Sequence, residues 1–161
     1  MVRTRGLACG VVLVAVVAGG CGGSERVEYE RDLSKVGRVV DDSLAELPTD
    51  DAETIGPDEV ARIADDLREA ADQLDDIDPP DDAQRAQERL GRGLRGVATT
   101  FDDLADDLRT ARTDAAKAEL FVRFATDERV DTAFDDLIGA QDAFAAQGYR
   151  VFGSRAPAKA G

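Results

Sequence analysis

Residues 86–108, AQERLGRGLRGVATTFDDLADDL, carry the pattern that decides the fold. Apolar residues recur at every third or fourth position of this stretch, which is the spacing of one face of an α-helix. These residues are Ala86, Leu90, Leu94, Val97, Phe101, Leu104 and Leu108. Charged residues and glycines fill most of the positions between them, so the stretch predicts a long amphipathic helix that ends near Arg112.

The same spacing predicts three more helices on either side of this stretch. One covers residues 29–47, a second covers residues 57–77, and another covers residues 114–148. Within the last of these, Thr126 followed by two acids is typical of a helix start, which leaves a break open at that point. The residues that we expect in the shared core are Leu33, Val40, Leu67, Leu74, Leu90, Leu94, Phe101, Leu104, Phe121, Phe134 and Leu137.

The arrangement of these helices predicts the fold class. No segment alternates between apolar and polar residues over a useful length, so we expect no sheet. Four amphipathic helices joined by short connections favour an all-α fold, and within it an antiparallel four-helix bundle over residues 27–152. We expect this single domain to be monomeric, and the small, unpatterned residues 153–161 to form a disordered tail.

The start of the chain has the composition of an export signal. Arg3 and Arg5 precede an unbroken apolar run over residues 7–18, and small residues then lead to Cys21. A basic start, an apolar run and a small-residue site are together typical of a secretory signal peptide. The apolar run is too short to span a bilayer, because a spanning helix needs about 20 apolar residues.

Residues 18–21, Ala-Gly-Gly-Cys, make this segment resemble a bacterial lipoprotein precursor. The resemblance implies that residues 1–20 are removed as a signal peptide and that the Cys21 thiol carries a diacylglyceryl group. The mature protein would then be anchored through Cys21 to the outer face of the cytoplasmic membrane, with residues 21–26 as a flexible tether. The alternative is an ordinary signal peptide that is cut nearby, with Cys21 incidental.

The charge and residue inventory exclude several classes of function. The chain has 20 basic and 34 acidic residues, and loss of Arg3 and Arg5 with the signal leaves 18 basic residues and a net charge of −16. Such an acidic surface repels nucleic acid, so we expect no nucleic-acid partner. The chain has no His, and its other cysteine, Cys9, leaves with the signal. Thiolate catalysis, Ser-His-Asp triads and imidazole metal sites are therefore excluded, and we expect neither an enzyme nor a bound cofactor.

One basic stripe interrupts this acidic surface. Its members share one side of the predicted central helix, roughly opposite the apolar face, and they are Arg85, Arg89, Arg92 and Arg95. We regard this stripe as the candidate partner-binding surface, and we expect reversal of its charges to leave folding nearly intact. The alternative is a solvated face that pairs with acids of neighbouring helices.

Five aspartates crowd the break between the second and third predicted helices. They lie around a Pro-Pro pair and are Asp75, Asp76, Asp78, Asp81 and Asp82. Clustered carboxylates suit a hard cation such as Ca²⁺, although the segment lacks the Asp-x-Asp-x-Asp-Gly loop of a defined calcium site. We therefore keep these residues as candidates for loose divalent-ion binding only, against the alternative of two helix ends that meet at a turn.

Residues 91–96, GRGLRG, match the Gly-x-Gly-x-x-Gly pattern letter by letter. A dinucleotide site needs a strand before this pattern and a helix opening after it, so that backbone N–H groups face the phosphates. Here the pattern lies inside a predicted helix. We therefore expect the glycines to permit a close approach of another helix, or a bend.

Beyond the signal, the chain resembles the small helical lipoproteins of unknown function found in high-GC Gram-positive bacteria. Because the residue inventory leaves no catalytic centre, we expect a non-catalytic protein-interaction module of the cell envelope, with an envelope protein as its partner. The alternative is an extracytoplasmic solute- or divalent-cation-binding lipoprotein, which needs a pocket with convergent polar groups. Gln141 is the one polar residue that we find on the apolar stripes. A carboxylate hydrolase is disfavoured because the aspartates fall on the outer faces of the predicted helices.

Overall fold

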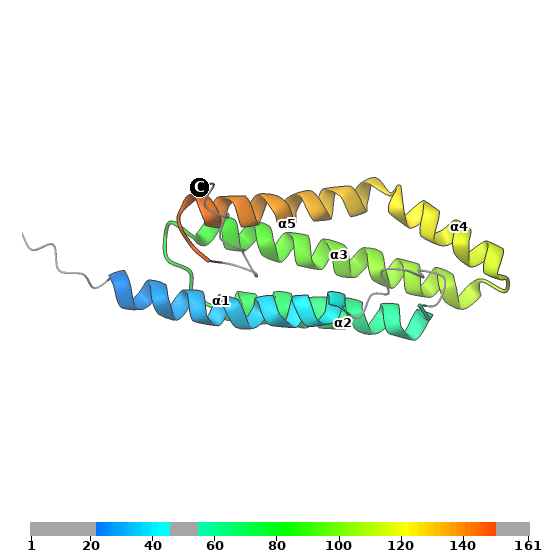
Figure 1. Cartoon of the computed structure of the whole chain (residues 1–161), viewed down its shortest axis with the longest axis horizontal. Helices are drawn as coiled ribbons and strands as arrows, with labels where there is room; N and C mark the ends of the chain where they lie inside the picture. Colours follow the sequence, from blue (N-terminus) through cyan, green and yellow to red (C-terminus); the bar gives the residue numbers. More distant parts are fainter. Residues whose placement is uncertain (1–21, 46–54, 151–161) are drawn as a thin grey trace, which may run out of the picture.

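The computed structural model describes residues 22–45 and 55–150, which we call the helical body. These residues form five α-helices and no strand, which confirms the all-α fold class (Figure 1). The expected signal peptide, Cys21 and the tail over residues 153–161 lie outside the described residues. The helices are α1 (Gly22–Ala45), α2 (Pro57–Asp75), α3 (Gln84–Thr110), α4 (Asp114–Ala125) and α5 (Glu128–Ala146).

Two helix ends follow directly from the local sequence. α2 begins at Pro57, whose fixed backbone angle suits the first helical position, and its first turn carries Asp58 and Glu59. These two acids lie near the partial positive charge of the helix N-terminus. α5 is followed by Gly148, whose φ of 77° is a left-handed conformation that glycine adopts without steric cost.

α1 begins earlier than the sequence analysis predicts. Residues 22–26 are expected to form a flexible tether, whereas the structure places them in the first turns of α1. Local charges favour this extension, because Glu25 lies in the first turn and Arg26 Nε approaches Glu30 Oε1 to 3.4 Å one turn later. The apolar spacing begins only at Tyr29 and could not show these contacts.

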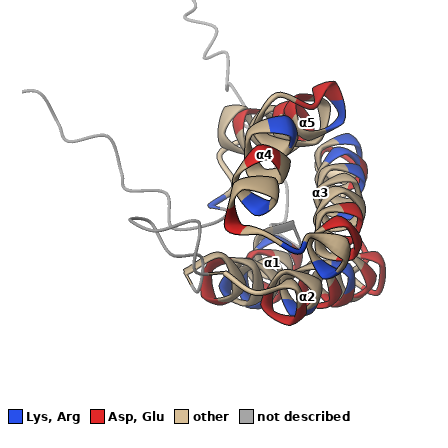
Figure 2. Ribbon diagram, turned by 90° about the vertical axis from the view of Figure 1, so that its right-hand side faces the viewer, with Lys and Arg blue, Asp and Glu red and all other residues tan. Residues whose placement is uncertain are grey.

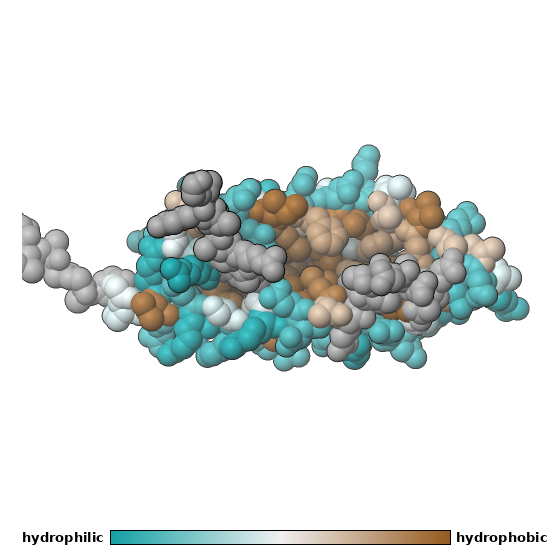
Figure 3. Space-filling view, in the orientation of Figure 1, coloured by the Kyte–Doolittle hydropathy of each residue, from teal (hydrophilic) through white to brown (hydrophobic). Residues whose placement is uncertain are grey.

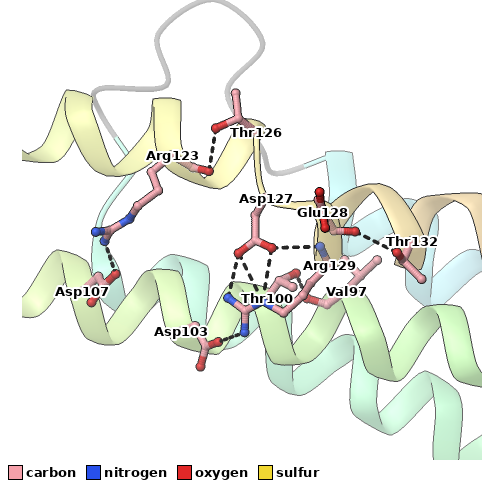
Figure 4. Close-up of polar contacts among 10 residues, drawn as sticks. All are labelled: Val97, Thr100, Asp103, Asp107, Arg123, Thr126, Asp127, Glu128, Arg129 and Thr132. Carbon is pink, nitrogen blue, oxygen red and sulfur yellow. Dashed lines mark hydrogen bonds and ion pairs between the residues drawn. The ribbon is translucent and has the colours of Figure 1, made fainter.

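The expected fourth helix consists of two helices. The Asp127 side chain accepts a hydrogen bond from the Arg129 backbone N–H at 2.8 Å and so caps the start of α5 (Figure 4). The Thr126 hydroxyl donates to the Arg123 carbonyl oxygen at 3.1 Å, at the end of α4. The break that the sequence left open at Thr126 is therefore present, because these side chains end one helix and start the next.

α3 lies at the centre of the helical body. It packs against α2 along one side and against α5 along the other, while α1 packs against α2, and α4 contacts α3. Figure 2 shows α1 and α2 on one side of the body and α5 on the other, with α3 between them. α1 also reaches α5 at one end of the body, where the rings of Tyr29 and Phe144 have centroids 6.4 Å apart.

Most of the expected core residues are buried. The buried members are Leu33, Val40, Leu67, Leu74, Leu90, Leu94, Phe101 and Leu104, and the partly buried ones are Phe121 and Leu137. The prediction for Phe134 is wrong, because its side chain is 38% exposed. Ala133 lies against α3, and each residue of a helix is turned about 100° from the one before it, so Phe134 points away from this contact.

Two glycines of α3 set its distance from α5. A Cβ atom added to Gly93 would lie 2.7 Å from Leu137 Cδ2, and one added to Gly96 would lie 2.9 Å from Ala133 Cβ. Interior carbon atoms are close-packed but do not approach one another to such distances, so only glycine fits at these two positions. The close helix approach that we expected from the GRGLRG pattern is therefore present.

Gly93→Ala should destabilise the helical body, although alanine favours a helix interior over glycine by about 1 kcal/mol. The new methyl group would press on Leu137, whose backbone nitrogen lies 3.0 Å away, and overpacking of this kind costs about 1–3 kcal/mol. Urea unfolding followed by circular dichroism should show a lower free energy of unfolding. Gly23→Ala is the matched control and should lose no stability, because no atom lies within 4 Å of its added Cβ. A Gly93→Ala protein as stable as the parent would contradict the tight contact.

Candidate functional site

The basic stripe lies on α3, and the position of α3 between two helices decides what its arginines contact. Arg89 donates from Nε to Asp136 Oδ1 at 2.9 Å and from Nη2 to the Asp135 carbonyl oxygen at 3.0 Å. Arg92 Nε lies 3.5 Å from Asp136 Oδ2. These two arginines therefore connect α3 to α5.

The two remaining arginines behave differently from this pair. Arg95 forms an ion pair with Asp75, and its Nη2 lies 3.8 Å from Asp72 Oδ1, so it connects α3 to α2. Arg85 is exposed and has no ion pair or hydrogen bond within the described part of the chain. The stripe is thus divided between two helix interfaces, and the contacts of Arg89, Arg92 and Arg95 agree with the alternative of a face that pairs with acids of neighbouring helices.

This division changes the expected effect of charge reversal. Glutamates at positions 89 and 95 would face Asp136 and Asp75 in place of the present ion pairs. Because these pairs are partly exposed, each contributes at most about 1 kcal/mol, but reversal adds repulsion at both interfaces of α3. Reversal at positions 89 and 95 should therefore lower the stability of the fold, which revises the expectation that folding stays nearly intact.

The acidic turn directs its carboxylates to different contacts. Asp75 pairs with Arg95, and Asp82 Oδ1 accepts a hydrogen bond from the Tyr149 hydroxyl at 2.6 Å. All five aspartates are exposed. In the two described ranges, no three His, Cys, Asp or Glu side chains come close enough together to hold a metal ion. The turn therefore gives divalent-ion binding no geometric support.

Buried polar contacts close one end of the helical body. The Tyr29 hydroxyl donates to Gln87 Oε1 at 2.8 Å, and Gln87 Nε2 donates to the carbonyl oxygens of Leu74 and Ile77 at 2.9 and 2.8 Å. The Tyr149 ring meets the Tyr29 ring edge-on, with centroids 5.5 Å apart. We call Tyr29, Gln87 and Tyr149 the end cluster. It joins α1, the end of α2, the start of α3 and the residues after α5.

Gln87 is a buried polar residue that the apolar spacing did not single out, and Ser43 and Thr100 are two others. Gln141, which we singled out instead, is exposed on α5. Gln87 lies three residues before Leu90 and seven before Leu94, and this spacing alone places it on the apolar face of α3. Among the described residues, every buried side-chain nitrogen or oxygen has a hydrogen-bond partner. The Gln87 amide is therefore engaged within the fold rather than directed at a ligand.

The end cluster raises the pKa values of both tyrosines. Burial, followed by the negative charges of ionised Tyr149 and of Asp82, raises the pKa of Tyr29 well above its ordinary value. Burial, followed by the hydrogen bond to Asp82, raises the pKa of Tyr149 to about 12. Both phenols therefore stay neutral at physiological pH, which fits a structural role and not that of a base.

The corner between α4 and α5 is tied to α3 by ion pairs. Arg129 Nη1 lies 2.7 Å from Asp103 Oδ2 and its Nη2 lies 2.7 Å from Asp127 Oδ2, while Arg123 pairs with Asp107 (Figure 4). Hydrogen bonds from the Arg129 side chain and backbone lower the pKa of Asp127. These groups are open to solvent, so we assign them to the placement of the corner rather than to chemistry.

α5 exposes two large apolar side chains, Phe134 and Ile138, which we call the α5 patch. They are 38% and 56% exposed. At about 100° per residue, both lie on the opposite flank of α5 from Asp136, the partner of Arg89. Figure 3 shows apolar atoms over the middle of the molecule, beside α5. The exposed acids nearest to the patch in sequence are Asp131, Asp135 and Asp142.

Comparison with known proteins identifies no relative: no protein family, curated protein or solved structure matches this chain. Within the described residues, none of the helices is both long enough and apolar enough to cross a membrane. The function is therefore inferred from the residues and their contacts.

Titration of the two tyrosines should show that neither ionises near pH 10 in the folded protein. Unfolded tyrosine loses its proton near pH 10, whereas folded Tyr149 keeps it to about pH 12. The stabilisation that this difference provides is complete below pH 10, and the free energy of unfolding should fall as the pH rises from 10 to about 12.

Phenolate absorbance in the near ultraviolet reports this titration cleanly, because the chain has no Trp. Tyr149→Phe is the control: it leaves Tyr29 as the only phenol and removes the hydrogen bond to Asp82. A midpoint near pH 10 in a protein that is still folded would contradict the buried end cluster.

Proposed function

We propose that this chain is a non-catalytic helical protein, lipid-anchored at Cys21 on the outer face of the cytoplasmic membrane, that acts through contact with another envelope protein. The basic start, the apolar run and the small residues before Cys21 support the anchor. The exposed α5 patch is the observation that carries the protein contact. We also propose that the helical body is an antiparallel four-helix bundle whose fourth helix is divided into α4 and α5.

The surroundings of the α5 patch indicate the chemistry of the partner. Phe134 and Ile138 offer apolar area that gains about 25 cal/mol for each Å² removed from water. Exposed acids accompany them on α5, and the whole chain carries an excess of negative charge. These features suit a partner with an apolar surface bordered by Lys or Arg, because charge complementarity guides encounter and favours that partner over acidic ones.

The α5 patch supports this role better than the other candidate sites do. Arg89, Arg92 and Arg95 are engaged in ion pairs between helices, so a partner of the basic stripe would have to compete with Asp136 and Asp75 for them. A solute-binding protein needs convergent polar groups that are available to a ligand. The buried amide of Gln87 is instead used by Tyr29 and by backbone carbonyl groups.

Cys21→Ser should move the protein from the membrane fraction to the soluble extracytoplasmic fraction. The variant loses the thiol that would carry the two acyl chains, and a single chain or none holds a protein at a membrane only marginally. Globomycin, which inhibits the lipoprotein signal peptidase, should shift the parent protein to lower gel mobility and leave Cys21→Ser unaffected. Unchanged membrane partitioning of Cys21→Ser would overturn the anchor.

Joint replacement of Phe134 and Ile138 by Ser should abolish the protein contact without unfolding the chain, since both side chains are exposed. Photo-cross-linking from position 141 of α5, in intact envelopes, should give one cross-linked band that the double variant loses. Val122→Ser is the control, because Val122 is an exposed apolar residue of α4 outside the patch. A band that persists in the double variant, with its circular dichroism unchanged, would show that the patch is not the contact.

A further inference from the structure

We propose that the helical body stands upright on the membrane, with the end that holds the start of α1 facing the lipid headgroups and the α3–α4 turn pointing away. The surface that meets the lipid is thus one end of the body rather than a helix face. This inference rests on the proposed acylation of Cys21. The inference adds to the acylation an orientation and a lipid-facing surface for the described residues.

The first support is the absence of a spacer between the acylation site and the fold. Gly22, the residue bonded to Cys21, is already the first residue of α1. The peptide bond from Cys21 therefore attaches the proposed anchor directly to the first residue of the helix. A flexible tether of the kind predicted from the sequence would let the body reorient freely relative to the membrane. A helix that starts next to the anchor restricts this reorientation.

The second support is that the start of α1 is fixed to the other helices. Arg26 Nη2 donates to the Gln147 carbonyl oxygen at 2.9 Å, and its guanidinium lies 4.2 Å from the centroid of the Tyr149 ring. One turn later, Tyr29 is bonded to Gln87 of α3. An anchor on residue 21 therefore orients α3 and the end of α5 together with α1, not α1 alone.

The third support is the charge of the surface. A hollow between the start of α1 and the α2–α3 turn is lined by five carboxylates, which are Glu25, Glu28, Asp32, Asp76 and Asp78. Such a surface meets the headgroup layer but does not insert below it, because burying unpaired carboxylates in hydrocarbon is costly. The whole chain carries an excess of negative charge, so an anionic leaflet repels both this end and the sides of the body. Lying flat is disfavoured against standing on the anchored end, because it brings more of this acidic surface close to the lipid.

The length of α3 fixes how far the opposite end stands from the lipid. α3 has 27 residues, and at 1.5 Å for each residue it is about 40 Å long. Gln87 lies in the first turn of α3 and belongs to the end cluster. Thr110, the last residue of α3, therefore lies at the far end of the body. Positions 84 and 110 should therefore differ by about 40 Å in their height above the headgroups.

Energy transfer from these two positions to a labelled lipid tests the orientation. Donor dyes on Gln84→Cys and Thr110→Cys are suitable because both residues are exposed, and the expected mature chain has no other free thiol. The acylated full-length protein would be placed in vesicles of phosphatidylcholine with a minority of phosphatidylglycerol and an acceptor-labelled lipid. We expect transfer from position 84 to be several-fold stronger than from position 110. Equal transfer from the two positions would overturn the upright orientation.

A matched pair of variants separates the direct connection from the anchor itself. A flexible Gly-Ser insertion between Cys21 and Gly22 should keep the protein on the vesicles but remove most of the difference between positions 84 and 110. Gly23→Ala should preserve the difference, because no atom lies within 4 Å of the added Cβ and alanine favours the helix. A difference that survives the insertion would overturn the role of the direct connection.

The outcomes also distinguish this inference from the proposed function. If the purified protein does not bind the vesicles, or binds equally well as Cys21→Ser, both the anchor and the orientation are wrong. If it binds through Cys21 but both positions transfer equally, the anchor stands and the orientation alone is wrong.

Discussion

The close approach of α3 to α5 at Gly93 and Gly96 is the contact on which the remaining architecture depends. Because these two residues have no Cβ atom, Leu137 and Ala133 of α5 lie close to the backbone of α3, and a side chain at either glycine would hold the two helices apart. At this distance Arg89 reaches Asp136, and the rotation of α5 about its own axis is fixed. The same rotation leaves Phe134 in solvent. The exposed patch on which the proposed function rests is thus a consequence of two missing Cβ atoms on a different helix.

Gln87 has a comparable role at the closed end of the body. The last carbonyl groups of a helix have no partner within that helix, and a buried one is costly if it stays unpaired. Gln87 donates to Leu74 near the end of α2 and to Ile77 in the turn that follows, and accepts from Tyr29 of α1. One amide side chain therefore satisfies the end of α2 and connects it to α1 and α3.

The sequence predicts the parts of this fold that depend on local spacing and local caps. The apolar repeat places α2 and α3 to within a few residues, because prolines and acids mark their ends. It leaves open the break at Thr126, which the structure shows. It fails where the answer lies on another helix: the exposure of Phe134 follows from glycines of α3, and the partners of Arg89 and Arg95 depend on which helices flank them. Cys21 lies outside the described residues, so its acylation stays a prediction.

The end cluster also determines how the protein would respond to mechanical tension. α1 packs along α2 and meets α5 near its start, so a force that pulls on α1 acts on these contacts. With the proposed anchor at Cys21, tension enters at Gly22, beside the contacts of Arg26 and Tyr29 with the rest of the body. Those bonds are then stretched together, in shear, before α1 can separate from α2.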